Sequence, residues 1–173
     1  MNRISIIAVV LVALARPAMS LLAQTPQPEW DRLAFLIGEW EGAGDPAGAT
    51  GGFAFARGAQ DHVVVRTNYS NTPAKGDLAA SRHDDLMIIY AEGGALKADY
   101  FDSEGHVIRY ILQPPSRADE VVFVSEIKGT EPRYRLTYAR QSAAALAGRF
   151  DVAPPGRPDA FAPYLTWSAR RRH

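Results

Sequence analysis

The chain of 173 residues has the length of a single domain, and its hydrophobic content of 47% is sufficient for a buried core. Its 19 basic and 19 acidic residues balance to a formal net charge of zero, which argues against a nucleic-acid-binding protein. It contains no cysteine, which excludes a disulfide framework, a thiolate metal site and a cysteine nucleophile.

The chain begins with the pattern of a signal peptide. Residues 2–3 carry a positive charge, and residues 4–15 form an uncharged apolar run. A run of this length is short for a bilayer span and typical of the central region of a signal peptide. An uncleaved membrane anchor is the alternative.

Two cleavage points fit the segment that follows, one after Ser20 and one after Ala23. We favour Ala23 because a polar linker starts at Gln24. The sequence thus predicts a signal peptide over residues 1–23 and a single exported domain, periplasmic or secreted, over residues 24–173. No later apolar run is long enough for a membrane span, so we expect none in the mature chain.

Residues 26–38 predict one short helix. Trp30, Leu33 and Ile37 fall at positions i, i+3 and i+7, so they share one helical face, and Gly38 is a natural stop. A helix this short is not stable alone and must pack on the rest of the domain.

Almost everything after Gly38 alternates with the period of two that is typical of strands. Glu92-Gly93-Gly94 and the segment 102–105 have the composition of tight hairpin loops. No long helix separates the strands, so we expect an all-β fold, an antiparallel up-and-down barrel of about ten strands with the helix at its closed end. A sandwich is the alternative. The expected strands cover residues 40–43, 53–57, 62–69, 86–90, 96–101, 107–112, 121–124, 133–138, 145–152 and 164–171.

The most informative motif is Gly38-Glu39-Trp40, which lies where the helix gives way to the first strand. With its context, Phe-Leu-Ile-Gly-Glu-Trp-Glu-Gly over residues 35–42, it resembles the opening of the calycin superfamily, which includes lipocalins, fatty-acid-binding proteins and nitrobindin-like barrels. Within this superfamily, the stretch looks like the opening of secreted bacterial lipocalin-like domains of unknown function and of nitrobindin-like barrels. The resemblance implies that Trp40 plugs the barrel floor and that an arginine of the last strand, Arg170 or Arg171, covers the indole.

The resemblance also raises the alternative of a haem protein. In nitrobindin-like barrels a histidine near the last strand holds ferric haem, and the matching stretch here places Tyr164 at that position. Tyrosine can ligate ferric haem, but we favour the interpretation that Tyr164 is an aromatic side chain at the barrel rim. We therefore expect no cofactor, with haem as the alternative.

Several aromatic and arginine side chains lie at alternating positions within the predicted strands. A barrel lined by aromatic side chains with one or two arginines would suit an amphipathic acid, with the guanidinium facing its carboxylate. Arg109 is the preferred arginine because Val107 and Ile111 on its face are apolar, although an outward position is also open. The candidate ligand-binding residues are Arg109, Tyr100, Tyr134, Tyr138 and Tyr164.

No signature of catalysis or metal binding accompanies this pattern. The four histidines, His62, His83, His106 and His173, lack metal-ligand spacing, and we interpret His83-Asp84-Asp85 as a solvated turn rather than a cation site. We predict no metal site and no catalytic residue. The favoured function is an exported binding protein for a small hydrophobic or amphipathic molecule. A haem barrel, a small-molecule enzyme on the same fold and a filled barrel that acts through its surface are the alternatives. The sequence does not indicate an oligomeric state.

Overall fold

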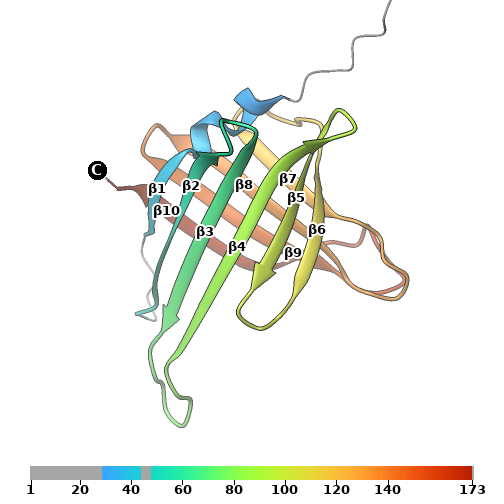
Figure 1. Cartoon of the computed structure of the whole chain (residues 1–173). Coiled ribbons are helices and arrows are strands. Elements are labelled where there is room, and N and C mark those ends of the chain that lie inside the picture. Colours follow the sequence, from blue (N-terminus) through green and yellow to red (C-terminus); the bar gives the residue numbers. More distant parts are fainter. Residues whose placement is uncertain (1–28, 44–47, 173) are drawn as a thin grey trace, which may run out of the picture.

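Ten antiparallel strands form one closed barrel in the computed structural model, which describes residues 29–43 and 48–172 (Figure 1). Each strand pairs with the next in the chain, and the first strand pairs with the last. The up-and-down barrel is therefore confirmed, and the sandwich alternative is excluded. The predicted signal peptide lies outside the described residues. The strands are β1 (Gly38–Gly42), β2 (Thr50–Gly58), β3 (Val63–Thr72), β4 (Ser81–Glu92), β5 (Ala95–Asp102), β6 (Val107–Leu112), β7 (Glu120–Ser125), β8 (Arg133–Ser142), β9 (Ala145–Ala153) and β10 (Ala162–Arg171).

The N-terminal helix differs from the prediction. The short N-terminal helix is confirmed, but helix η1 spans Trp30–Leu36, so it ends before the predicted residue 38, and it is a 3-10 helix, which is wound more tightly than the spacing of the apolar residues suggests. Its tighter winding of three residues per turn brings Leu33 and Leu36 onto one side, and both are buried against the end of the barrel. No helix in the described part of the chain is long and apolar enough to cross a membrane.

The strand register determines which side chains face inward. Val64 pairs with Ile89, and Ile89 pairs with Ala98, and all three side chains are buried. Because paired residues lie on the same side of a sheet and neighbours along a strand alternate, these pairs define the inner face all around the barrel.

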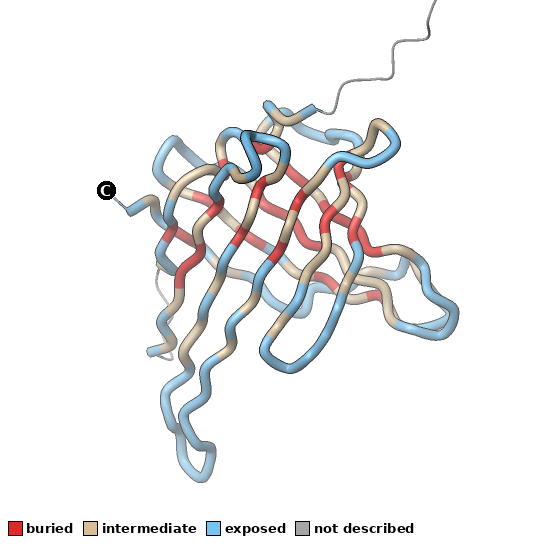
Figure 2. The backbone as a smooth tube through the Cα atoms, in the orientation of Figure 1, coloured by how far each residue is buried: buried red, intermediate tan, exposed pale blue. Residues whose placement is uncertain are grey.

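The interior is packed at one end and accessible at the other. Inward-facing residues near η1, such as Phe55 and Leu146, are buried, whereas inward-facing residues near the other end, such as Tyr134 and Phe150, are only half-buried. Figure 2 shows the buried positions concentrated toward the helical end of the barrel. The barrel therefore has a closed end capped by η1 and an open half that solvent reaches.

Candidate functional site

Trp40 and Arg171 close the floor of the barrel. The indole of Trp40 is buried and donates a hydrogen bond of 2.8 Å to the carbonyl of Leu36 at the end of η1. The guanidinium of Arg171 lies over the indole, with its central carbon 4.2 Å from the ring centroid. It also donates to the carbonyls of Ile37 at 2.8 Å and Phe35 at 3.1 Å. One arginine therefore ties β10 to both the floor residue and the helix cap.

Gly38 permits this arrangement. Its φ of +125° lies in the left-handed region that favours glycine, and a Cβ atom there would collide with the guanidinium of Arg171. The other arginine that the sequence offered for this role, Arg170, is exposed and does not cover the indole.

A buried ion pair lies in the interior, at the boundary between the packed end and the open half. The guanidinium of Arg66 on β3 lies 3.0 Å from the carboxylate of Asp85 on β4, and their side chains are only 7% and 4% exposed. Asn68 donates a further hydrogen bond of 2.7 Å to Asp85. Nε2 of His83 lies 3.4 Å from the same carboxylate, so several charged groups converge here and keep this part of the interior strongly polar.

Three polar atoms in this region accept or donate no hydrogen bond within the described part of the chain. They are Nε of Arg66, Oδ1 of Asp85 and the hydroxyl of Tyr138. Oδ1 of Asp85 is nevertheless paired, because Nη1 of Arg66 lies 3.0 Å from it. Nε of Arg66 and the hydroxyl of Tyr138 are therefore the buried polar atoms of this region that keep unused hydrogen-bonding capacity.

Burial keeps the surrounding tyrosines protonated. Desolvation raises the pKa of Tyr138 to about 12, against the lowering effect of Arg66. Desolvation likewise raises the pKa of Tyr100 and that of Tyr110. These hydroxyls are therefore neutral groups that can both donate and accept hydrogen bonds.

Aromatic side chains form the opposite wall of the open half. Tyr134 on β8 stacks on Phe150 on β9, with ring centroids 5.6 Å apart and planes 11° apart. Trp167 on β10 also faces inward and packs edge-on against Tyr138, in space that Gly148 leaves free. The rings of Tyr164 and Phe150 are nearly perpendicular, with their centroids 6.2 Å apart. The open half thus combines a polar wall on β3–β5 with an aromatic wall on β8–β10.

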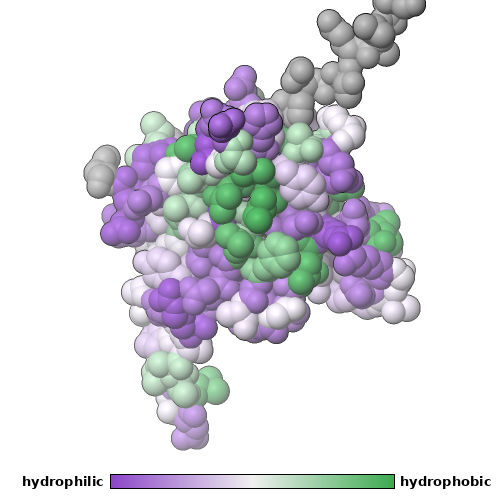
Figure 3. All heavy atoms as spheres, in the orientation of Figure 1, coloured by the Kyte–Doolittle hydropathy of each residue, from purple (hydrophilic) through white to green (hydrophobic). Residues whose placement is uncertain are grey.

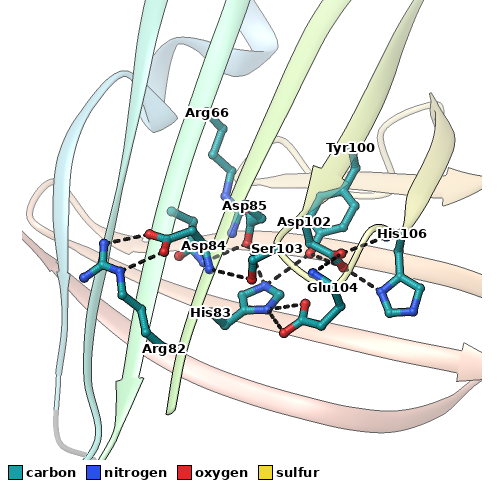
Figure 4. Close-up of polar contacts among 11 residues, drawn as sticks. Arg66, Arg82, His83, Asp84, Asp85, Tyr100, Asp102, Ser103, Glu104 and His106 are labelled. Atoms are coloured by element: carbon teal, nitrogen blue, oxygen red, sulfur yellow. Dashed lines mark hydrogen bonds and ion pairs between the residues drawn. The ribbon is translucent and has the colours of Figure 1, made fainter.

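Two histidine–carboxylate pairs surround the mouth of the barrel (Figure 4). Nδ1 of His83 lies 2.8 Å from Glu104, and Nδ1 of His106 lies 2.8 Å from Asp102. Burial lowers the pKa of His83, but the hydrogen bond and charge of Glu104, together with Asp85 and Asp102, raise it overall. The interpretation of His83-Asp84-Asp85 as a solvated turn was wrong, because all three residues lie within β4 and the side chain of Asp85 is only 4% exposed.

The mouth also holds a set of donor atoms suited to a cation. One donor atom each from His83, Asp102 and Glu104 lies within 4.8 Å of the others. Nitrogen and carboxylate oxygen donors suit a divalent transition metal. The sequence did not predict this set, because Asp102 and Glu104 approach His83 only through the pairing of β4 with β5.

The structure separates the predicted ligand-binding residues into two groups. Tyr100, Tyr134 and Tyr138 face inward, and Tyr164 lies at the mouth at a register shift in β10 and is 76% exposed. Arg109 lies on the outer face of β6 with its side chain 63% exposed, beside Asp99. It is therefore not brought together with the tyrosines.

Sequence reasoning did not select the interior arginine, Arg66. The alternation Val64, Arg66, Asn68 was visible, but the other face of the same strand, with Val63 and Val65, is equally apolar. The pairing with Asp85 depends on the β3–β4 register, which no local signal specifies.

The outer surface carries an apolar patch of its own. Leu86, Phe101 and Val107 are cross-strand partners on β4, β5 and β6, and each is between 36% and 52% exposed. Figure 3 shows apolar side chains gathered on this outer face. The patch faces away from the interior site.

Comparisons with known proteins add no assignment to this geometry. No model of a protein family matches the chain, and no curated protein matches it.

Proposed function

We propose that this protein is an exported calycin-type barrel that binds a small hydrophobic or amphipathic molecule in its open half. The observation that carries the proposal is the barrel interior, which is packed at one end and half-exposed at the other, with an aromatic wall on β8–β10 opposite the buried pair of Arg66 and Asp85. A binding site that is mostly apolar, with a few convergent polar groups, is the usual form of a small-molecule site.

Two further features support the calycin-type assignment and export. A tryptophan before the first turn of the barrel and an arginine from the last strand stack at the closed end. The positive start and apolar run of residues 2–15 support export to the periplasm or beyond. The expected partner is a small molecule, with no nucleic acid, since the chain has no net charge.

The proposal is tested by binding of octanol to the mature protein, followed by calorimetry and by tryptophan fluorescence. Phe150→Ala removes an inward-facing ring from the aromatic wall, and we expect it to weaken binding by about ten-fold. Phe101→Ala is the matched control, since it removes a ring from the outer face. Equal affinity in the two variants, or no binding of octanol at all, would contradict a site in the open half.

The same preparation tests the haem alternative. Native mass spectrometry and an absorbance spectrum, before and after addition of hemin, report a bound ligand mass and a haem band. A haem band that disappears in Tyr164→Phe would replace the present proposal with a haem barrel. A co-purified organic molecule without such a band supports the proposal.

A further inference from the structure

Three metal-ligating side chains converge at the mouth of the barrel, where β4 and β5 enter the open half (Figure 4). We propose that His83, Asp102 and Glu104 bind one divalent transition-metal ion, of which Zn²⁺ is the simplest probe. The proposal does not depend on the small-molecule site in the open half. It also differs from the sequence prediction of no metal site, which considered the spacing of histidines along the chain and not the pairing of strands.

The strand register brings the three donors together. Asp102 pairs with Asp85, so both face inward, and His83 lies two residues from Asp85 on the same face of β4. The turn after β5 places Glu104 against His83, with its carboxylate 2.8 Å from Nδ1 of the imidazole. One donor atom from each of the three residues lies within 4.8 Å of the others. Ligands that share one zinc ion at about 2.0–2.2 Å lie about 3–4 Å apart, so small rotations of the partly exposed His83 and Glu104 complete the site.

A second set of contacts orients these donors from behind. Nε2 of His83 lies 3.4 Å from the carboxylate of Asp85, whose side chain is only 4% exposed. A histidine that binds a metal through one ring nitrogen usually donates the other N–H to such a carboxylate. The carboxylate of Asp102 accepts from the backbone N–H groups of Glu104 at 3.1 Å and His106 at 2.9 Å, and Nδ1 of His106 lies 2.8 Å from it. These contacts distinguish the site from a chance group of acidic side chains on a surface, because they fix the imidazole and one carboxylate before an ion arrives.

The donor types specify the class of ion. Asp102 and Glu104 supply two negative charges, which balance a divalent cation, and His83 supplies an imidazole nitrogen. Ca²⁺ and Mg²⁺ prefer oxygen ligands alone, whereas a nitrogen donor among carboxylates favours Zn²⁺ and its transition-metal neighbours. Three protein ligands leave a coordination position for water or for a donor atom of a molecule at the mouth, as in zinc sites that exchange ligands.

Calorimetry on the mature protein, first treated with a chelator and dialysed, measures the binding of Zn²⁺ and Mg²⁺. We expect one Zn²⁺ per chain, bound at least about ten-fold more tightly than Mg²⁺. Glu104→Gln removes one ligand charge at a half-exposed position, so folding should be retained while Zn²⁺ binds at least about ten-fold more weakly. Glu131→Gln is the matched control, because it makes the same change at an exposed position in another loop and should leave the affinity unchanged.

Co²⁺ provides a second readout, because its visible absorption reports the ligands around it. The Co²⁺ spectrum should change in His83→Gln, which removes the nitrogen donor, and stay the same in His62→Gln, which removes an exposed histidine from the turn after β2. No saturable binding of Zn²⁺ or Co²⁺, unchanged Zn²⁺ affinity in Glu104→Gln, an unchanged Co²⁺ spectrum in His83→Gln, or Mg²⁺ bound as tightly as Zn²⁺ would each overturn the proposed metal site. None of these outcomes bears on the small-molecule site, which the binding of octanol tests separately.

Discussion

Replacing Arg171 with methionine should destabilise the barrel at its closed end. Methionine keeps an apolar stem of similar length but has no donor, so the carbonyls of Ile37 and Phe35 lose their bonds of 2.8 Å and 3.1 Å, and Trp40 loses a cation 4.2 Å from its centroid. Each hydrogen bond is worth about 1 kcal/mol net, and the cation–π contact adds about 1 kcal/mol. The expected loss is therefore about 3 kcal/mol in the free energy of unfolding.

The neighbouring arginine supplies the control for this experiment. Arg170 lies on the same strand but is exposed, so Arg170→Met should change the free energy of unfolding by less than about 0.5 kcal/mol. Urea denaturation followed by circular dichroism gives both values, and thermal unfolding should show Arg171→Met lower in Tm by about 6–12 °C. Equal effects of the two substitutions, or a loss below about 1 kcal/mol for Arg171→Met, would refute the assignment of Arg171 as the residue that secures the floor.

Three further predictions concern other parts of the molecule. Gly38→Ala should lower the free energy of unfolding by at least about 2 kcal/mol, because it combines a left-handed φ with a collision against the guanidinium of Arg171. Gly105→Ala, at a φ of +88° with open space around it, should lower it by only about 1 kcal/mol. Chemical denaturation distinguishes the two variants. Asp151→Ala removes a fully buried carboxylate that accepts hydrogen bonds from Arg135 at 2.8 Å and Arg149 at 3.1 Å, so we expect the free energy of unfolding to fall by about 3 kcal/mol. Asp159→Ala, which removes one partner of an exposed ion pair, should be nearly neutral in the same assay. Burial lowers the pKa of His83, but its carboxylate neighbours raise that pKa overall. The stability that protonated His83 adds to the fold is therefore complete below the pKa of histidine in the unfolded chain, and it is lost as the pH rises through the pKa of His83 in the folded protein. The Tm advantage of the wild type over His83→Gln should therefore shrink as the pH rises above the ordinary histidine pKa of about 6.5, and a constant difference would contradict the pairing.

The fold was predictable because the information that specifies it is local. Period-two alternation, the turn residues between strands and the absence of long helices in the sequence together indicated a closed antiparallel barrel, and that prediction is confirmed. The helix before β1 was less predictable. The spacing of Trp30, Leu33 and Ile37 suits an α-helix, but the tighter 3-10 winding instead buries Leu33 and Leu36.

The site was less predictable because it depends on which face of each strand turns inward. Val107 and Ile111 made the face of Arg109 look internal, yet outer faces of barrels also carry apolar residues, and β6 points this face outward. An error of one residue in register inverts every such assignment. The buried pair of Arg66 and Asp85 joins residues from two strands, and only the tertiary structure identifies the partner.

The seam between β1 and β10 has a consequence for how the chain folds. Only three residue pairs join these strands, and one of them is Trp40 with Arg171, the two residues that meet on the barrel floor. Every other strand pairs with a neighbour in sequence, so hairpins can form early, whereas the seam must bring together residues 131 positions apart. Closure should therefore be the slow, late event of folding. The backbone amides of β1 should exchange their hydrogens more readily than those of the long β3–β4 hairpin, because opening the seam breaks few bonds.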